Sequence, residues 1–478
     1  MHETPHGDTG TARQALASLW ASLSLEADAL DDVALTGAEP ILPSSFRVGT
    51  AAQVTIAGAA LAAARTGLLR NGRRQQISVD MRHAAYECCN WFSIDGRVPS
   101  IWEKYSGLYR CGDGWVRIHA NFPHHRDGAL RLLGLPPGET ASRDDVTRAL
   151  AQRDPFAFEQ SAAEAGMVVS ALRSFDAWDR HPHAAAVAAQ PLVALERIGD
   201  APPRALPTLG AHARPLSGVK VLDLTRILAG PVAGRALAAY GADVMLVNAP
   251  HLPNIDAIAD TSRGKLSALA DLRSPADRAA FEHVLRDTHV LVQGYRPGAL
   301  QALGFGAEAL AARRPGLVVV SLSAYGETGP WAGRRGFDSL VQTGTGFNHA
   351  EALAAGADTP KALPMQIIDH ASGYLLALGA LAALQRQQHD GGSWHVRVSL
   401  ARTGLWLRGL GRVTDGFSAP AADFAPYAET SDSGWGRLVA LRHAAVFSDT
   451  PAAWPRPSVR PGTHPLRWPD DREEGGTG

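Results

Sequence analysis

Apolar runs and helix-like stretches alternate along the second half of the chain. Short runs rich in Val, Leu and Ile predict strands at 219–224, 242–247, 290–293 and 317–322. The stretches between them predict helices at 234–240, 276–286 and 308–313. Strands separated by helices of this length are typical of βαβ units, in which a parallel sheet is covered on both faces. The pattern therefore predicts an α/β fold with a Rossmann-like, doubly wound domain over residues 216–410.

The first 200 residues contain too few such alternations for a second doubly wound sheet. They predict helices at 55–69, 152–165 and 173–178, and strands at 76–81 and 114–119. A smaller α+β domain fits this content. We therefore divide the chain into an N-terminal helical region (1–45), a segment with the small domain (46–200), a Pro-rich linker (201–215), the Rossmann-like domain (216–410) and an irregular tail (411–478).

A shift of 319 residues aligns two parts of the chain. Residues 59–82 and 378–401 each predict a helix, a turn at Gly72 or Gly391, and a strand. In this register Asp369 falls opposite Thr50. Few residues are identical, so a true duplication and a likeness of two Ala-rich helices both remain open.

Charge and cysteine content exclude several classes of protein. The chain has 46 Lys and Arg against 47 Asp and Glu, which gives a net charge of −1 without a block of like charge, so we expect no nucleic acid and no membrane partner. Three cysteines support neither a disulfide framework nor a zinc site, and the start lacks the pattern of a signal peptide. We expect a cytoplasmic protein. Only four of the 46 basic residues are Lys, which suggests a GC-rich bacterial genome.

The candidate functional residues lie mainly in the second half of the chain. The loop after the first strand, near Gly230, leads into a helix whose free backbone N–H groups could bind an anion. A Gly-x-Gly-x-x-Gly motif is missing, and the second strand ends on Asn248 rather than on an acidic residue. NAD is therefore a weak second choice as the ligand. The pairs His124-His125 and His181-Pro-His183 lack further metal ligands, and we expect no metal.

Asp369 stands between the apolar pair Ile367-Ile368 and a strongly apolar helix. It has two possible roles. As a structural residue it is the N-cap of that helix, which the sequence alone favours; as a functional residue it is a carboxylate nucleophile at a positive helix end.

Several motifs in this order resemble the class III CoA-transferases, the family of formyl-CoA transferase, carnitine CoA-transferase and α-methylacyl-CoA racemase. The resemblance covers about 195 residues, from Leu216 to Leu410. Its motifs are Gly218-Val-Lys-Val-Leu-Asp-Leu-Thr-Arg-Ile-Leu-Ala-Gly-Pro, Tyr240-Gly-Ala-Asp-Val, Arg263-Gly-Lys265, Tyr295-Arg-Pro-Gly298, Ser323-Ala-Tyr-Gly-Glu-Thr-Gly-Pro330, Gly336-Phe-Asp338 and Asp369-His-Ala-Ser-Gly373. Residues 54–195 resemble the later part of a family member. The chain thus looks like a family sequence with its parts exchanged, or like a fused pair whose first copy lost its Rossmann half; the repeat favours the fused pair.

The resemblance implies the site residues and the partners. It places the acylated carboxylate at Asp369. It implies coenzyme A contacts, with CoA as a substrate moiety and no tightly bound cofactor, at Arg263, Lys265, Arg273, Tyr295, Arg335, Gly336, Phe337 and Asp338. It also implies acyl-CoA and carboxylic acid substrates, and a homodimer whose sites lie between the large domain of one chain and the small domain of the other. Asn248, Gly294 and Arg235 depart from the family pattern, so we expect rearranged contacts to the adenine and pantetheine parts of CoA.

Three functions remain open. The first is CoA transfer through an aspartyl intermediate. The second is racemisation of a 2-methylacyl-CoA, which needs a general acid and base; the family's racemases have His at the position of Phe337, which cannot carry a proton. The third is a non-catalytic acyl-CoA-binding protein.

Overall fold

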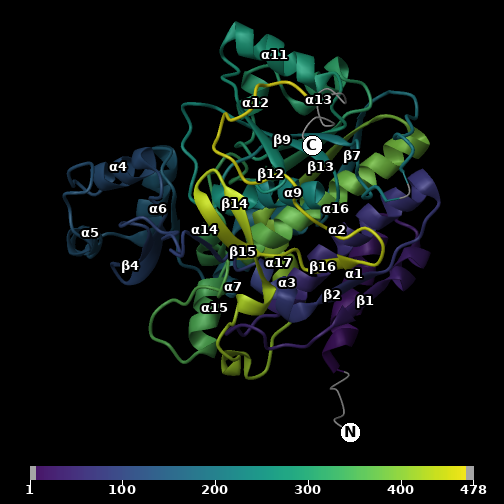
Figure 1. Cartoon of the computed structure of the whole chain (residues 1–478). Helices are drawn as coiled ribbons and strands as arrows, with labels where there is room; N and C mark the ends of the chain where they lie inside the picture. Colours follow the sequence, from purple (N-terminus) through teal and green to yellow (C-terminus); the bar gives the residue numbers. More distant parts are fainter. Residues whose placement is uncertain (1–6, 211, 470–478) are drawn as a thin grey trace.

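A seven-stranded sheet forms the centre of the protein, as the computed structural model shows (Figure 1). The structure describes residues 7–210 and 212–469. The first six strands are parallel and the edge strand β7 is antiparallel to β13. The spatial order is β10 (Lys265–Leu269), β9 (Asp243–Asn248), β8 (Lys220–Leu224), β11 (Val290–Gln293), β12 (Val318–Ser323), β13 (Ser393–Ser399) and β7 (Ala194–Gly199). This order, which reverses between β8 and β11, confirms the Rossmann-like prediction.

Helices cover both faces of this sheet. Neighbouring residues of β8 show the two-sided burial: Val221 belongs to one apolar core and Leu222 to the other. The first face carries α9 (Ala229–Ala239), α16 (Ile367–Asp390) and, packed on α16, α2 (Val48–Asn71). The second face carries α11 (Pro275–Leu285), α12 (Ala299–Ala302) and α13 (Ala307–Arg313).

The helices α2 and α16 are long and apolar enough, by length and composition, to cross a membrane, but both are largely buried in the protein core. α2 begins at Val48, whereas the sequence predicted residue 55. The helix is buried on nearly all sides, so no amphipathic stripe marks its start.

A small α+β unit projects from the sheet domain, at the left of Figure 1. It has an apolar core of its own around Tyr109 and Leu130. Its strands are β4 (Gly107–Cys111), β5 (Gly114–Ile118) and β6 (Val169–Ala171), and its helices are α4 (Pro123–Leu132), α5 (Arg143–Leu150) and α6 (Pro155–Glu164). We call this part, residues 105–172, the small unit. It agrees with the smaller α+β domain predicted for the first 200 residues.

The remaining elements surround α2 and α16. They form two further three-stranded sheets, β1-β2-β16 and β14-β15-β3. Their bounds are α1 (Gly7–Ser22), η1 (Ala27–Asp32), β1 (Val33–Thr36), β2 (Ile77–Asp80), α3 (Met81–Glu87), β3 (Phe92–Ile94), α7 (Phe175–Asp179), α8 (Pro182–Ala188), α10 (Ile258–Thr261), α14 (Asp338–Gly344), α15 (Phe347–Ala354), α17 (Leu400–Gly409), η2 (Gly416–Ser418), η3 (Ala425–Tyr427), β14 (Ala428–Ser433), β15 (Gly436–Leu441) and β16 (Ala445–Phe447).

One sequence expectation, the irregular tail, is corrected here. The tail is not irregular throughout, because β14, β15 and β16 pair with one another or with strands of the first half. The partners of β15 and β16 in the first half, β3 and β2, lie more than 300 residues away, which the local pattern could not reveal. Residues 201–210 have no regular structure, as expected of the linker.

Candidate active site

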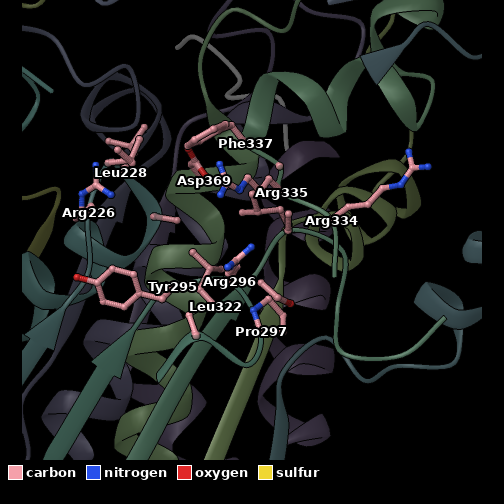
Figure 2. A pocket seen from close by; sticks show the side chains of 18 of the residues that line it. Arg226, Leu228, Tyr295, Arg296, Pro297, Leu322, Arg334, Arg335, Phe337 and Asp369 are labelled. Carbon is pink, nitrogen blue, oxygen red and sulfur yellow. The ribbon is translucent and has the colours of Figure 1, made fainter. Parts of the chain in front are cut away.

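A cavity of about 320 Å³ opens where the strand order reverses (Figure 2). In open α/β sheets ligands bind at this switch point, outside the carboxyl ends of the strands. The loops after β8, β11 and β12 line the cavity, together with Asp369 near the start of α16. The small unit contributes Phe122, His124 and His125.

Asp369 lies in the first turn of α16, and its side chain does not cap the helix. The N-cap is Gln366, so the N-cap role that the sequence favoured for Asp369 is wrong. Asp369 is 7% exposed and lines the cavity. Gly373, one turn further on, lets α16 approach α9 closely: a Cβ there would lie 2.6 Å from the carbonyl oxygen of Ala229. The carboxyl group is thereby held near the N-terminal end of α9.

Asp338 is the immediate polar neighbour of Asp369. Its Oδ2 accepts a 2.9 Å hydrogen bond from the backbone N–H of Asp369, and its side chain is fully buried. Burial raises the pKa of Asp338 to about 6, although hydrogen bonds from Asp369 and Gln342 oppose the rise. Burial, and then the nearby Asp338, raise the pKa of Asp369 well above its ordinary value. Two carboxyl groups this close resist simultaneous ionisation.

Arginines make the rest of the cavity positive. Arg226, Arg296, Arg334 and Arg335 all line it, whereas Asp369 is the one acidic residue among the described lining residues. Figure 2 shows Arg334 extending away from the others, and its NH2 group donates to Gln160 of the small unit. Burial lowers the pKa of Arg226 and Arg335, although both remain cations at neutral pH. Such a cavity favours an anionic ligand.

The loop after β8 carries local backbone strain. Ile227 has a φ of 76°, a conformation that is unfavourable for a β-branched residue. The next residue, Leu228, is the N-cap of α9, and its side chain makes no capping hydrogen bond. Leu228 and Ala229 both line the cavity, so the N-terminus of this helix opens onto it. Free backbone N–H groups at such a position bind anionic oxygens.

Two histidines of the small unit contact residues that line the cavity. The ring of His119 stacks on that of Phe337 with centroids 3.9 Å apart and planes 11° apart. Arg335 donates a 3.0 Å hydrogen bond to Nε2 of His125, because a guanidinium can only donate. Burial lowers the pKa of both His119 and His125 to about 3, so both rings are neutral near pH 7.

The structure brings together five of the residues predicted to contact CoA and separates three. Tyr295, Arg335, Gly336 and Phe337 line the cavity, and Asp338 lies directly behind Asp369. Three of the basic residues predicted to contact CoA do not line the cavity: Arg263, Lys265 and Arg273.

Each of these three basic residues forms an ion pair with a nearby acidic residue. Nζ of Lys265 is buried and donates 2.8 Å to Asp223. Arg273 is 59% exposed and pairs with Asp271. Arg263 is 3% exposed and pairs with Asp260 in the interior. Position near a strand end predicted ligand contact, but each of the three cations pairs with an acid, in the interior for Lys265 and Arg263 and at the surface for Arg273.

Other residues of the cavity were missed or undervalued in the sequence. Arg226 lies two residues after the end of β8, and a position just after a parallel strand is a signal for ligand contact. His124 and His125 come from a different part of the chain, so only the fold reveals their contribution. In residues 7–210 and 212–469, no group of three or more His, Cys, Asp or Glu could hold a metal ion.

Comparisons with known proteins agree with this geometry. Residues 216–419 match the model of CoA-transferase family III. The chain is 29% identical over 365 residues to an acyl-CoA transferase of Gibberella moniliformis, covering 68% of this chain and 64% of that protein. It is 34% identical to the probable fatty acyl-CoA transferase Rv3272 of Mycobacterium tuberculosis, covering 41% of this chain and 53% of that protein. It is 30% identical to formyl-CoA:oxalate CoA-transferase of Streptomyces coelicolor, covering 41% of this chain and 50% of that protein.

The chain spans less than two thirds of the length of each of these relatives. A crystal structure of Rv3272 matches 42% of this chain and 58% of its own, with 34% identity and a TM-score of 0.38. The family match spans strands β8 to β13 of the sheet that carries the cavity. Residues 216–419 of this chain are therefore similar to CoA-transferase family III.

Proposed function

We propose that the protein transfers CoA from an acyl-CoA donor to a carboxylic acid acceptor, with Asp369 as the nucleophile. One observation carries the proposal: among the described residues, Asp369 is the one carboxyl group that lines the cavity at the switch point of the sheet, and the other charged lining residues are arginines. Phosphate-rich ligands require such cations, and acyl transfer requires such a nucleophile. The match of residues 216–419 to CoA-transferase family III supports this reaction class.

The cavity residues divide between binding and chemistry. Arg226, Arg296 and Arg335 supply cationic donors for the phosphates of CoA, and the N-terminus of α9 supplies backbone N–H groups. The ring of Tyr295 offers a surface on which the adenine can stack. CoA is a substrate moiety in this proposal, and the protein needs no resident cofactor.

The reaction proceeds by covalent steps at Asp369. Its ionised carboxylate attacks the thioester carbonyl carbon of the donor, the carbon–sulfur bond breaks, and a mixed anhydride and CoA thiolate form. The thiolate attacks the aspartyl carbonyl, which releases the donor acid and leaves an aspartyl-CoA thioester. The acceptor carboxylate then repeats these steps in reverse. Each step forms an oxyanion, which free N–H groups beside Asp369 would stabilise.

A CoA-exchange assay tests the proposal. Wild-type protein is incubated with a panel of acyl-CoA donors and isotope-labelled carboxylic acids, and labelled acyl-CoA is measured. We expect exchange with at least one pair, and a loss of at least about a thousandfold in Asp369→Asn, which keeps the shape but removes the nucleophile. Exchange at an undiminished rate in Asp369→Asn would contradict the mechanism. Binding of acyl-CoA with no exchange across the panel would favour the non-catalytic binding protein.

Racemisation remains the second candidate because two histidines, His124 and His125, line the cavity with Asp369. Phe337, at the position where a racemase carries its His, stacks on His119 and cannot transfer a proton. Incubation with a 2-methylacyl-CoA in deuterated water distinguishes the two reactions. Catalytic incorporation of α-deuterium would reverse the order of the candidates.

A further inference from the structure

Two parts of the chain have the same fold at a constant distance in the sequence. The helices α2 and α16 both have 24 residues, and adding 319 to the bounds of α2 gives the bounds of α16. Each helix is followed by a glycine, Gly72 or Gly391, then by a strand and a further helix. The junctions between each of these strands and the helix after it also match. Asp80 and Ser399 are 319 residues apart, and each caps the helix that follows.

The starts of the two long helices share an unusual geometry. The N-cap residues Arg47 and Gln366 have φ/ψ of −78°/60° and −81°/60°, neither of which is helical or extended. Two residues into each helix, a backbone N–H donates a 2.9 Å hydrogen bond to a carboxylate from another segment. Thr50 donates to Glu39, and Asp369 donates to Asp338.

The strands after these helices pair in the same way. Asp80 of β2 lies opposite Thr36 of a parallel neighbour, and its equivalent Ser399 lies opposite Ser323 of a parallel neighbour. On the other side both strands have an antiparallel neighbour, β16 for β2 and β7 for β13. The order β1-β2-β16 therefore matches β12-β13-β7. A chance likeness of two Ala-rich helices does not give the strand after each helix a parallel neighbour on one side and an antiparallel neighbour on the other.

The two parts differ in what surrounds this shared unit. The second part has the full parallel sheet before its long helix, whereas the first part has β1 alone at the matching position. The first part has the small unit between α3 and β7, whereas the second part has the β14–β15 hairpin between α17 and β16. The first part thus lacks most of the parallel sheet, and the second part lacks a small unit.

We propose that the chain is a fused pair of diverged copies that builds one complete site within a single chain. The second copy supplies Asp369 and the sheet, and the small unit of the first copy supplies His125 and Phe122 across the cavity. The first copy has Thr50 where the second has Asp369, and this hydroxyl is buried against Glu39, so the first copy has no nucleophile at that position. The homodimer that the resemblance predicts remains untested. Under this inference a second chain is not needed to complete the site.

A designed disulfide tests whether the small unit closes the site of its own chain. Ser170 lies on β6 of the small unit and Gly344 at the end of α14 in the sheet domain. A Cβ built on Gly344 lies 3.9 Å from the Cβ of Ser170, which matches the usual separation of about 3.8 Å in a disulfide. The native thiols Cys88 and Cys111 are buried and Cys89 is half-buried, so peptide mapping must distinguish the 170–344 bond from a bond to Cys89.

The full-length Ser170→Cys/Gly344→Cys protein is oxidised, denatured and analysed by non-reducing electrophoresis and peptide mapping. We expect a 170–344 disulfide in a species with the mass of one chain. An equal mixture of the two single-cysteine variants, which can form this bond only between chains, should give none. A covalent two-chain species joined at 170–344, or a folded double variant that never forms this bond, would overturn the inference.

A second measurement applies if the double variant does not fold, and this one rests on the proposed function. Asp369→Asn chains are mixed with chains whose small unit carries His125→Ala, and CoA exchange is compared with that of each variant alone. A site built within one chain predicts no gain on mixing beyond the sum of the two. Recovery toward the wild-type rate would show that small units serve other chains. Inactive wild-type protein would instead contradict the proposed function and leave the disulfide result standing.

Discussion

The backbone N–H of Asp369 donates a 2.9 Å hydrogen bond to Oδ2 of Asp338, so one buried carboxylate positions the residue that carries another. The bond joins the start of α16 to the start of α14. It fixes the first turn of α16 beside the cavity without using the side chain of Asp369. The same contact places two acids together, and their mutual repulsion adds to the effect of burial on the pKa of Asp369.

Replacement of Asp338 by Asn should move the pH dependence of transfer to lower pH. Asn keeps an oxygen that accepts the N–H of Asp369 but removes the neighbouring charge, so the pKa of Asp369 should fall. Because the ionised form of Asp369 is the nucleophile, wild-type activity should rise with pH and the variant's activity should rise earlier. The profile of kcat/KM against pH measures this. An unchanged profile, or a shift to higher pH, would show that Asp338 does not control this ionisation.

Asp369→Asn should make the protein more stable near neutral pH while it abolishes transfer. The pKa of Asp369 is higher in the folded state than in the unfolded state, so the folded state binds the carboxyl proton more tightly. The folded state therefore loses stability as the pH rises above the unfolded-state pKa of Asp369. Removal of the acid eliminates this loss. Melting temperatures at pH 8 and near pH 4 should show a gain for the variant that shrinks at the lower pH. A lower melting temperature at pH 8 would mean that the carboxylate is stabilising.

Arg335→Gln should weaken acyl-CoA binding by about tenfold, as expected for the loss of one charge-assisted contact to phosphate. The change should raise KM more than it lowers kcat, because Arg335 binds the substrate without joining in the bond changes. Arg148→Gln is the matched control, since Arg148 is 75% exposed on α5 and pairs with Asp145. Equal KM values for the two variants would remove Arg335 from the CoA site.

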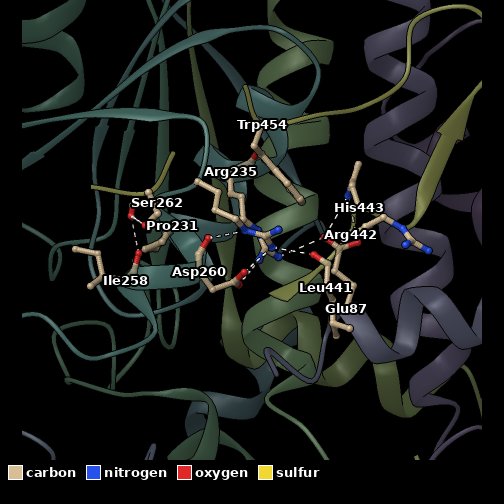
Figure 3. Close-up of polar contacts among 12 residues, drawn as sticks. Glu87, Pro231, Arg235, Ile258, Asp260, Ser262, Leu441, Arg442, His443 and Trp454 are labelled. Carbon is tan, nitrogen blue, oxygen red and sulfur yellow. Dashed lines mark hydrogen bonds and ion pairs between the residues drawn. The ribbon is translucent and has the colours of Figure 1, made fainter. Parts of the chain in front are cut away.

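Glu87→Gln should destabilise the fold without changing KM. Glu87 accepts hydrogen bonds from Tyr374 (2.6 Å) and the backbone of Ala444 (2.8 Å), and it pairs with Arg235. Figure 3 shows this cluster. Burial would raise the pKa of Glu87, but His443 and Arg235 outweigh it and hold the pKa below its usual range.

Loss of one partner from such a buried cluster lowers the free energy of unfolding by about 3 kcal/mol. Denaturant titration at pH 7 measures the loss. The difference from wild type should shrink as the pH falls, because protonation removes the charge of Glu87 in both states. A variant as stable as wild type at pH 7 would show that the cluster contributes nothing to stability.

The sequence predicted the sheet domain well because the signal is local. Runs such as Val290–Gln293 are strands buried on both faces, and short apolar runs between helices mark them directly. The motif around Asp369 also identified the candidate nucleophile. Its placement inside the helix, rather than at the N-cap, depends on Asp338, which is 31 residues away.

Contacts between distant segments could not be predicted in the same way. His125 and Arg335 are 210 residues apart, and nothing in either local pattern points to the other. Lys265 and Arg263 looked available for a ligand, but Asp223 and Asp260 pair with them in the interior. A basic residue near a strand end is a ligand candidate only when no internal acid uses its charge.

Mass spectrometry of the protein after incubation with an acyl-CoA donor tests the central claim most directly. If Asp369 is the nucleophile, wild-type protein should carry a hydroxylamine-sensitive adduct of CoA, and peptide mapping should locate it at Asp369. Asp369→Asn should carry none under the same conditions. An adduct at another residue, an adduct of equal yield in Asp369→Asn, or exchange of CoA by wild-type protein that never yields an adduct at Asp369 would contradict the account.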